Sequence, residues 1–305
     1  MAEALAHGTG AGCLGVVGLG LMGSVLATRW LEAGGRVVGY DVDAAACAGL
    51  VAAGGTLAGG VAEVFRRCDR VVLSLPSDRE VEDVLFGPEK VLRSGLLVVD
   101  TTTGEPGLRE VWGIRLAELG GGYVDATISG SSEQVRRGEG LWMLGGELNW
   151  VGHAEEVVKV FGGRMVRTGG WGSGARMKLV TNLVLGLNRA VLAEGLAFGG
   201  ALGLVKAEVL EVLRASAAYS RAMDSKGGKM VSGEYDPPEA RLLQHLKDVD
   251  LICEEAKRNG QALPLSAVHR DLLRQAQERG CGGLDNSVIL RVMETLRGDE
   301  REGGG

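Results

Sequence analysis

Histidine, cysteine and clustered positive charge are all scarce in this sequence. Only four of the 305 residues are histidine and five are cysteine, and neither type has the spacing of metal ligands, so we predict no metal site. The cysteines are scattered without a Cys-x-x-Cys pair, which excludes a disulfide framework and favours a reducing, cytoplasmic compartment. No Gly-x-Ser-x-Gly motif is present, so a hydrolase nucleophile of that kind is excluded.

Neither a nucleic acid nor a membrane is expected as a partner. The net charge is −6 and no run of lysine and arginine occurs, so we expect no nucleic-acid partner. The N-terminus lacks a basic segment followed by an apolar one, and no secretory signal is predicted. The most apolar stretch, Leu179–Val205, contains Asn182, Asn188, Arg189 and Glu194. Membrane spans rarely hold so many polar groups, so this stretch predicts a buried helix and no membrane partner.

The pattern along the chain predicts two domains, as its length also suggests. Up to Gly172, short β-branched runs alternate with helical stretches, which indicates a parallel sheet with helical crossovers. The predicted strands are 14–17, 36–40, 70–75, 96–99, 122–124, 141–144 and 165–166. The predicted helices between them are 21–32, 43–51, 61–65, 79–85 and 107–119.

After Gly172 the strand signals vanish. The predicted helices are 175–202, 206–215, 238–259, 265–277 and 287–296. We therefore predict a doubly wound α/β domain over 13–172 and an all-helical domain over 173–297. A long helix with its N-cap on Ser173 would join them. Residues 1–12 and 298–305, rich in glycine, are predicted to be flexible tails.

A Gly-x-Gly-x-x-Gly turn lies near the start of the α/β domain. With 51 glycines the pattern is expected about once or twice by chance, and a second copy exists at Gly10–Gly15. Only the copy at Gly18–Gly23 follows an apolar strand and opens a helix, which is the setting that a dinucleotide pyrophosphate needs. The domain is therefore predicted to be of the Rossmann type. The predicted cofactor contacts in this turn are Gly18, Leu19, Gly20, Leu21, Met22 and Gly23.

An acidic residue, Asp41, ends the next predicted strand, roughly 20 residues after the turn. A carboxylate there accepts hydrogen bonds from both ribose hydroxyls of NAD and repels the 2′-phosphate of NADP. No arginine follows in 42–45. The alternative is a surface aspartate that only ends a strand, but the order of strand, turn, helix, strand and acid favours NAD, with NADP less favoured.

Further segments resemble one family, the β-hydroxyacid dehydrogenases, which include 3-hydroxyisobutyrate and tartronate semialdehyde dehydrogenases. Asp100–Pro106 (DTTTGEP) is similar to the family's D-x-S-T-x-x-P loop, and Asp125–Ser131 (DATISGS) to its D-A-P-V-S-G-G loop. Met143–Gly146 (MLGG) resembles its M-V-G-G segment. Gly172–Asn182 (GSGARMKLVTN) matches its catalytic G-x-G-x-x-x-K-x-x-x-N helix, and Lys247 begins its K-D pair. The resemblance covers roughly residues 13–295.

The resemblance implies a role for each matching residue. Lys178 would be the general acid/base and Asn182 would orient the substrate. Ser129, Gly130 and Ser131 would bind the substrate. Additional cofactor contacts would come from Leu75, Pro76, Thr103 and Lys247. The family also implies a homodimer or homotetramer, which the continuous apolar surface of 183–205 favours as well.

The residue types permit this chemistry on physical grounds. Lys178 and Asn182 are four apart and project from one helix face. Oxidising an alcohol requires a base for the hydroxyl proton, and a lysine can serve if burial or a second cation, such as Lys247, lowers its pKa. A lone lysine would be read as a solvated helix residue. The position of Lys178 between the two glycines and Asn182 favours the catalytic reading.

Three positions depart from the family pattern, and two rival functions remain. Thr127 replaces the usual proline, Ser131 the second glycine, and Thr181 a frequent asparagine, which suggests a more polar substrate than 3-hydroxyisobutyrate.

An imine reductase resembles the family in fold but usually lacks the lysine, and a non-catalytic dinucleotide-binding regulator typically loses the lysine or the acid. We therefore predict an NAD-dependent oxidoreductase that interconverts a small 3-hydroxy acid and its semialdehyde or keto acid.

Overall fold

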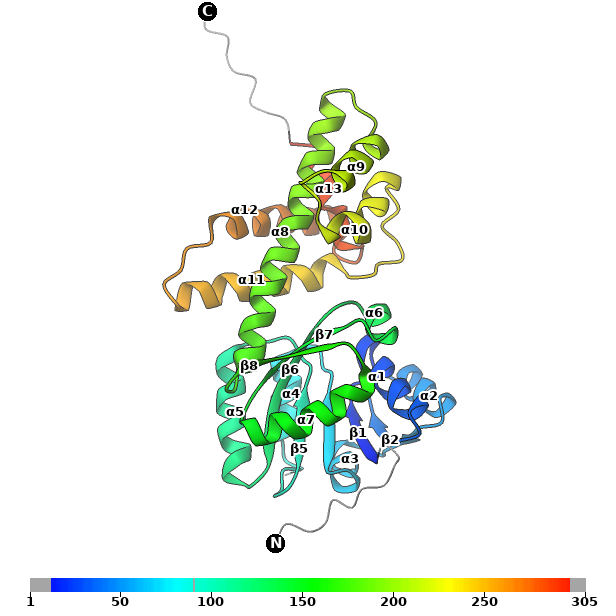
Figure 1. The fold of residues 1–305 in the computed structure, drawn as a ribbon, viewed down its shortest axis with the longest axis vertical. Coiled ribbons are helices and arrows are strands. Elements are labelled where there is room, and N and C mark those ends of the chain that lie inside the picture. Colours follow the sequence, from blue (N-terminus) through cyan, green and yellow to red (C-terminus); the bar gives the residue numbers. More distant parts are fainter. Residues whose placement is uncertain (1–11, 90, 297–305) are drawn as a thin grey trace, which may run out of the picture. The chain divides into compact units, whose positions relative to one another are not determined.

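The computed structural model describes residues 12–89 and 91–296, and the chain divides into two compact units, Met1–Lys178 and Leu179–Gly305 (Figure 1). Apart from Gly12, the predicted tails 1–12 and 298–305 lie outside the described residues. A helix, α8 (Ser173–Ala201), crosses the boundary between the units. The fold class predicted from the sequence, a Rossmann-type sheet followed by a long helix and a helical domain, is confirmed.

The first unit contains an eight-stranded sheet with the order β3-β2-β1-β4-β5-β6-β7-β8. The strands are β1 (Cys13–Val17), β2 (Arg36–Tyr40), β3 (Thr56–Leu57), β4 (Arg70–Leu73), β5 (Leu97–Asp100), β6 (Gly122–Ser129), β7 (Leu141–Gly145) and β8 (Arg164–Gly169). The chain runs outward from β1 to β3 and then returns to place β4 on the other side of β1. This reversal creates a switch point between β1 and β4, where ligands bind in such sheets.

One strand direction corrects the sequence prediction. All neighbouring pairs are parallel except β6 and β7, which are antiparallel. The connection between them, residues 130–140, holds only the short helix α6 (Ser132–Arg136). It is shorter than the helical crossover that a parallel pair requires, so the chain turns back on itself.

Helices cover both faces of the sheet, because the central strands bury both of their faces. These helices are α1 (Leu21–Glu32), α2 (Ala44–Ala52), α3 (Val61–Arg67), α4 (Asp78–Phe86), α5 (Pro106–Glu118) and α7 (Leu148–Phe161). Val16 and Val72 pack in a core with Trp30 of α1. Their neighbours Val17 and Val71 belong to a second core, which includes α3, α4 and α5. This arrangement fixes the carboxyl ends of the strands at one edge of the sheet.

The second unit is helical. Besides the rest of α8 it contains α9 (Lys206–Ala215), α10 (Arg221–Ser232), α11 (Leu242–Arg258), α12 (Pro264–Ala276) and α13 (Ile289–Met293). Its core includes Leu196, Met230, Leu246 and Leu273. The prediction that α11 begins at 238 was wrong by a few residues, because Arg241 is still extended and forms the N-cap.

Helix α8 is, among the described residues, the one helix long and apolar enough by length and composition to cross a membrane. Inside the protein, 44% of its most apolar window is buried. Leu192, Ala193 and Leu196 from this helix pack in the core of the helical unit. Part of the apolar surface of α8 therefore builds that core.

Candidate functional site

The glycine turn between β1 and α1 leaves one glycine facing open space. Gly18 has a φ of +90°, and a Cβ there would lie 2.2 Å from the carbonyl oxygen of Ser74. A Cβ at Gly23 would lie 1.9 Å from the Gly18 carbonyl oxygen, so helix and strand pack too closely for any other residue. Gly20 is the N-cap of α1, has no heavy atom within 4 Å of an added Cβ, and leaves the cap without a side-chain bond. The turn therefore fits a dinucleotide pyrophosphate, which approaches the backbone at such an N-terminus.

Asp41 lies against this turn. One of its carboxylate oxygens accepts a hydrogen bond of 2.6 Å from the Leu19 N–H, and the other accepts one of 2.8 Å from the Asp43 N–H. Strands β1 and β2 are in register up to the pair of Val17 and Tyr40, which brings the end of β2 beside the glycine turn. These two bonds orient Asp41, and because a carboxylate oxygen can accept a second hydrogen bond, both oxygens can still receive ribose hydroxyls.

The turns after β4 and β5 are tied together beside the glycine turn. The Leu75 N–H donates a hydrogen bond of 3.1 Å to the Thr102 Oγ1, and the Thr101 hydroxyl donates one of 2.8 Å to the Leu73 carbonyl oxygen. Because β1, β4 and β5 are parallel, their carboxyl ends lie at one edge of the sheet. The residues predicted to contact the cofactor in these turns are Leu75, Pro76 and Thr103, and of these Pro76 is exposed and the other two are half-buried.

A buried ionic network that sequence reasoning missed supports the turn after β5. The fully buried Arg109 of α5 pairs with Asp78 and lies 3.6 Å from Asp100. It also donates a hydrogen bond of 3.2 Å to the Thr102 carbonyl oxygen. The Tyr123 hydroxyl donates one of 2.6 Å to Asp100. Nothing in the sequence distinguishes Arg109 from an exposed helix arginine, because its partners come from outside its own helix, from α4 and from the end of β5.

The first turn of α8 is held by two side chains of β6. Asp125 accepts hydrogen bonds from the N–H groups of Gly172, at 3.1 Å, and Ala175, at 2.8 Å. The buried Thr127 hydroxyl donates one of 2.8 Å to the Gly174 carbonyl oxygen. Burial raises the pKa of Asp125 to about 7, against the opposing effect of its backbone hydrogen bonds. Thr127 thus binds the helix and is buried within the protein.

The predicted N-cap on Ser173 was wrong. Helix α8 already includes Ser173, and the preceding Gly172 has a φ of +78°. The Ser173 hydroxyl is instead 2.8 Å from the Thr168 hydroxyl. The sequence rule looks for a cap among adjacent residues, whereas Asp125 supplies this one from a distant strand.

Close backbone approach explains the glycines before the lysine. A Cβ at Gly174 would lie 2.7 Å from the Asp125 carbonyl oxygen. A Cβ at Gly145, on β7, would lie 2.6 Å from the Ser173 Oγ. The start of α8 is therefore pressed against β6 and β7. This contact fixes the direction in which the next turn of the helix, with Lys178, leaves the sheet.

Lys178 reaches the end of β6. Its Nζ donates a hydrogen bond of 2.5 Å to the Ile128 carbonyl oxygen, directly before Ser129 and Gly130. Gly130 has a φ of +143°. Ser131 is the N-cap of α6 and forms a capping box with Gln134, so these two side chains support the loop. The structure therefore brings together the residues predicted as acid/base and as carboxylate ligands.

In the helical unit, Asn182 is paired with a carboxylate. Its amide nitrogen donates a hydrogen bond of 3.1 Å to Asp248 on α11. Asn182 is buried, whereas Lys247 and Asp248 are half-buried. The bond fixes the amide so that its oxygen points away from Asp248. Sequence reasoning named the Lys-Asp pair but assigned no role to Asp248, and the pair itself was the available signal.

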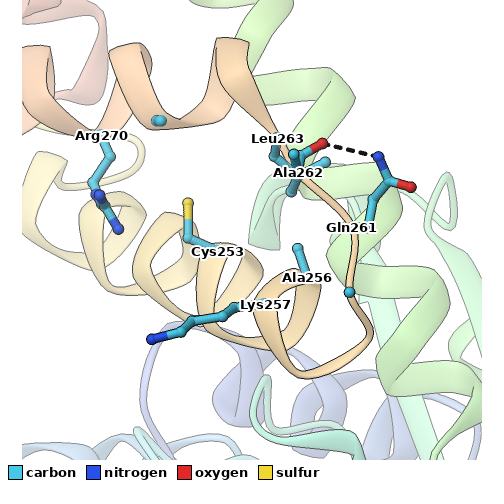
Figure 2. Close-up of a pocket in the computed structure, with 9 residues that line it drawn as sticks. Cys253, Ala256, Lys257, Gln261, Ala262, Leu263 and Arg270 are labelled. Atoms are coloured by element: carbon cyan, nitrogen blue, oxygen red, sulfur yellow. Dashed lines mark hydrogen bonds between the residues drawn. The ribbon is translucent and has the colours of Figure 1, made fainter.

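A separate cavity of about 400 Å³ lies at the turn between α11 and α12 (Figure 2). Figure 2 shows Cys253 and Lys257 on α11 and Arg270 on α12 around it. None of the residues predicted from the sequence to bind cofactor or substrate lines it. It is therefore not part of the candidate site.

Two protein families match successive parts of the chain. Residues 13–170 match the NAD binding domain of 6-phosphogluconate dehydrogenase. Residues 172–293 match the NAD-binding domain of NADP-dependent 3-hydroxyisobutyrate dehydrogenase. Together the matches cover both units.

Individual proteins align over nearly the whole chain. It is 31% identical over 283 residues to L-threonate dehydrogenase of Cupriavidus necator, which covers 92% of this chain and 95% of that protein. It is 32% identical over 295 residues to 2-(hydroxymethyl)glutarate dehydrogenase of Eubacterium barkeri, with 95% and 98% covered. The crystal structure of a 3-hydroxyisobutyrate dehydrogenase from Salmonella typhimurium superposes with a TM-score of 0.84 at 26% identity, over 92% of this chain and 99% of the other.

Proposed function

Because the chain belongs to the 3-hydroxyisobutyrate dehydrogenase-like family of β-hydroxyacid dehydrogenases, which are NAD(P)-dependent oxidoreductases, we propose that it interconverts a small 3-hydroxy acid and its semialdehyde or keto acid with NAD. The names of two relatives, L-threonate and 2-(hydroxymethyl)glutarate dehydrogenase, support a small hydroxy acid as the substrate. When bound, the nicotinamide accepts the hydride of the alcohol carbon or returns it.

The residues for the cofactor lie at the switch point of the sheet. The open N-terminus of α1 at Gly20 would hold the pyrophosphate. Asp41 would accept hydrogen bonds from the two hydroxyls of the adenosine ribose, and the negative charge of Asp41 would disfavour a 2′-phosphate. Leu75, Pro76 and Thr103 would lie along the nicotinamide half. The family pattern assigns Lys247, in the helical unit, as a further cofactor contact.

The substrate carboxylate would be bound by the Ser129 hydroxyl and the Gly130 N–H. Both are donors that can hold a carboxylate without a full counter-charge. In the direction of oxidation, the neutral amine of Lys178 would accept the proton of the substrate hydroxyl, while the hydride leaves the carbon that bears this hydroxyl. In the direction of reduction the ammonium of Lys178 donates that proton to the carbonyl oxygen. Asn182, held by Asp248, would orient the substrate oxygen.

One observation carries this proposal: the 2.5 Å hydrogen bond from the Lys178 Nζ to the Ile128 carbonyl oxygen. It supports the proposal because Ile128 directly precedes Ser129 and Gly130, the two donors proposed for the carboxylate. The direct experiment is a panel of C3 to C6 hydroxy acids with NAD, followed by the absorbance of reduced nicotinamide. Turnover of at least one 3-hydroxy acid, with no turnover of the corresponding simple alcohols, would support the proposal. No turnover of any member in either direction would count against it.

The exposed face of α8 supports a homo-oligomer. Val184, Val191, Phe198 and Leu202 are all exposed and recur at the spacing of one helix face. Gly195 lies between Val191 and Phe198, and an added Cβ there would have no heavy atom within 4 Å, which allows a second backbone to approach. A contiguous apolar stripe of this length is typical of a protein interface. We therefore propose a homodimer or homotetramer that covers this face.

A further inference from the structure

The helical unit buries a guanidinium whose inner nitrogens have no partner. Arg189 of α8 is 5% exposed. Its Nε and Nη1 atoms are buried and donate no hydrogen bond to any residue that the structure describes. Burial lowers the pKa of Arg189 to about 10, in spite of the opposing charges of Asp285 and Asp248. Arginine remains protonated at neutral pH, so this unit holds a buried positive charge, and its Nε and Nη1 bond to no carboxylate among the described residues.

Two buried imidazoles lie beside this arginine. His245 of α11 is 7% exposed and His269 of α12 is 3% exposed, and their ring centroids are 5.2 Å apart. The Nε2 atom of each ring is buried without a hydrogen-bond partner in the described part of the chain. Burial and then the charge of Arg189 lower the pKa of both rings, that of His269 to about 4. Both imidazoles are therefore neutral at pH 7, and each can donate one N–H.

The two imidazole rings pack over one position of α8, Gly186, one helical turn before Arg189. A Cβ at Gly186 would lie 2.8 Å from the His245 Cε1 and 3.0 Å from the His269 Cε1. Gly186 precedes Arg189 by three residues, so both lie on the same side of the helix. The missing side chain at Gly186 leaves room for the two rings beside the helix backbone. Arg189 and the two rings thus lie on one side of α8, and four of their buried nitrogens have no hydrogen-bond partner among the described residues.

The nearest carboxylates are already occupied. Asp285 accepts a hydrogen bond of 2.8 Å from the Lys226 ammonium and another from the Ser287 hydroxyl. Asp248 accepts one of 3.1 Å from the Asn182 amide. Both act on Arg189 through charge, but neither bonds to its Nε or Nη1. A buried water could satisfy the imidazoles but would not balance the guanidinium charge.

We infer that Arg189, His245 and His269 form a binding site for a compact monoanion, either a halide ion or the carboxylate of an acid as small as formate. The guanidinium supplies the charge, and the two imidazole N–H groups supply additional donors. The same guanidinium excludes metal cations, although two imidazoles stand together. Burial on all sides excludes large or doubly charged anions, which would lose more hydration than the cluster replaces. The site lies wholly in the helical unit and does not depend on the proposed activity.

The first test is a thermal titration at constant ionic strength, in which sodium bromide replaces sodium gluconate. The melting temperature of the wild type should rise and saturate, because an anion bound only by the folded state stabilises it. Arg189→Met should lose this rise and, in gluconate alone, should melt no lower than the wild type, since it removes an unpaired buried charge. Arg258→Met, which removes a half-exposed arginine of the same unit, is the matched control and should respond like the wild type. An equal bromide response in wild type and Arg189→Met would overturn the inference.

The second test locates the ion and separates the two sources. Crystals soaked in bromide should show an anomalous peak beside Arg189, and sodium formate should shift the melting curve if a carboxylate also enters. His269→Phe keeps the charge of Arg189 and removes one imidazole N–H. The bromide concentration that gives half of the maximal rise in melting temperature should therefore increase several-fold. This variant keeps the inference testable if Arg189→Met does not fold. Bromide peaks only elsewhere on the molecule, or an unchanged half-saturation in His269→Phe, would contradict the site.

Discussion

The carboxylate of Asp125 on β6 caps helix α8 by accepting a hydrogen bond of 2.8 Å from the Ala175 N–H. A second hydrogen bond, from the Gly172 N–H, reaches its other oxygen. The helix that carries Lys178 is therefore held at its start by a residue of the sheet. Because Lys178 lies one turn later, the position of its amine depends on this cap.

Replacing Asp125 by asparagine should weaken the cap. An amide has one acceptor oxygen, so one of the two backbone N–H groups would face an NH₂ group. The loss of this buried cap should cost about 1–3 kcal/mol of unfolding free energy. Turnover should fall while NAD affinity, which depends on the glycine turn, stays unchanged. Asp83→Asn, at an exposed position, is the control.

The pH dependence of this effect has a definite sign. Burial raises the pKa of Asp125 from 3.8 to about 7, so the folded protein holds this proton more tightly than the unfolded chain. The contribution of Asp125 to stability is then largest at low pH and declines as pH rises from about 4 to 7. The free energy of unfolding in urea should be measured for the wild type and Asp125→Asn at pH 5 and pH 8. The excess of the wild type over the variant should be smaller at pH 8. A larger advantage at pH 8 would contradict this account.

Cofactor choice should follow Asp41. The wild type should use NAD with a higher kcat/KM than NADP, because the carboxylate meets the 2′-phosphate with like charge. Asp41→Ala should lower the ratio of kcat/KM with NAD to kcat/KM with NADP, mainly because kcat/KM with NAD falls. Asp43→Ala, in the same turn, is the matched control. Comparable efficiency of the wild type with both cofactors would remove the basis for this assignment.

Asp285 should act as a structural anchor of the helical unit. Although burial by itself favours the neutral form, the bonds from Lys226 and Ser287 lower the pKa of Asp285 to about 2. Asp285→Asn leaves the Lys226 ammonium without its buried partner and should cost roughly 3–5 kcal/mol. Since the folded pKa is lower than the unfolded one, the stabilisation is present above pH 4 and is lost as pH falls toward 2. Asp271→Asn is an exposed control, and an equal loss of stability in both variants at pH 7 would refute the role.

Oligomerisation should depend on the exposed face of α8. Sedimentation velocity at micromolar concentration should show a dimer or tetramer. Phe198→Glu, at the middle of the stripe, should shift the distribution toward the 31.8 kDa chain, because a buried unpaired charge disfavours the interface. Arg176→Glu, outside the apolar stripe, is the control. A wild type that sediments only as the single chain would exclude the interface.

Local features were predictable from the sequence, and non-local pairings were not. The glycine turn and Asp41 follow one another in a fixed order along the chain, so their proximity could be inferred before the structure. The Asp125 cap joins residues 50 apart, and the pair of Asn182 and Asp248 joins residues 66 apart. Neither bond leaves a periodic trace in the sequence, so both required the fold.

Helix α10 shows a second reason for failure. Gly227 and Gly228 lower its helix propensity, and Lys226 places a charge on its buried face. The pairing of Lys226 with Asp285, at 2.8 Å, and the packing of Met230 in the core outweigh that low propensity. Tertiary contacts therefore determine this helix, which is absent from the helices predicted from the sequence.

The proposed role of Asn182 separates orientation from proton transfer. Asn182→Ala should lower kcat moderately and keep the pH dependence of the wild type, because the amide does not titrate. If the pH dependence of kcat were lost in this variant, Asn182 would take part in the proton transfer, and its role would not be orientation alone.

The central claim is that Lys178 is the acid/base, and the most direct measurement is the pH profile of hydroxy-acid oxidation by Lys178→Ala and Lys178→Arg. Both should bind NAD nearly as tightly as the wild type, since the contacts for the pyrophosphate and ribose lie at Gly20 and Asp41. Turnover should fall by roughly 10²–10⁴, and arginine should not restore it because a guanidinium does not accept the proton. The rise of the wild-type rate with pH should vanish in both variants. An alanine variant that keeps near-wild-type turnover with the same rise would contradict the account.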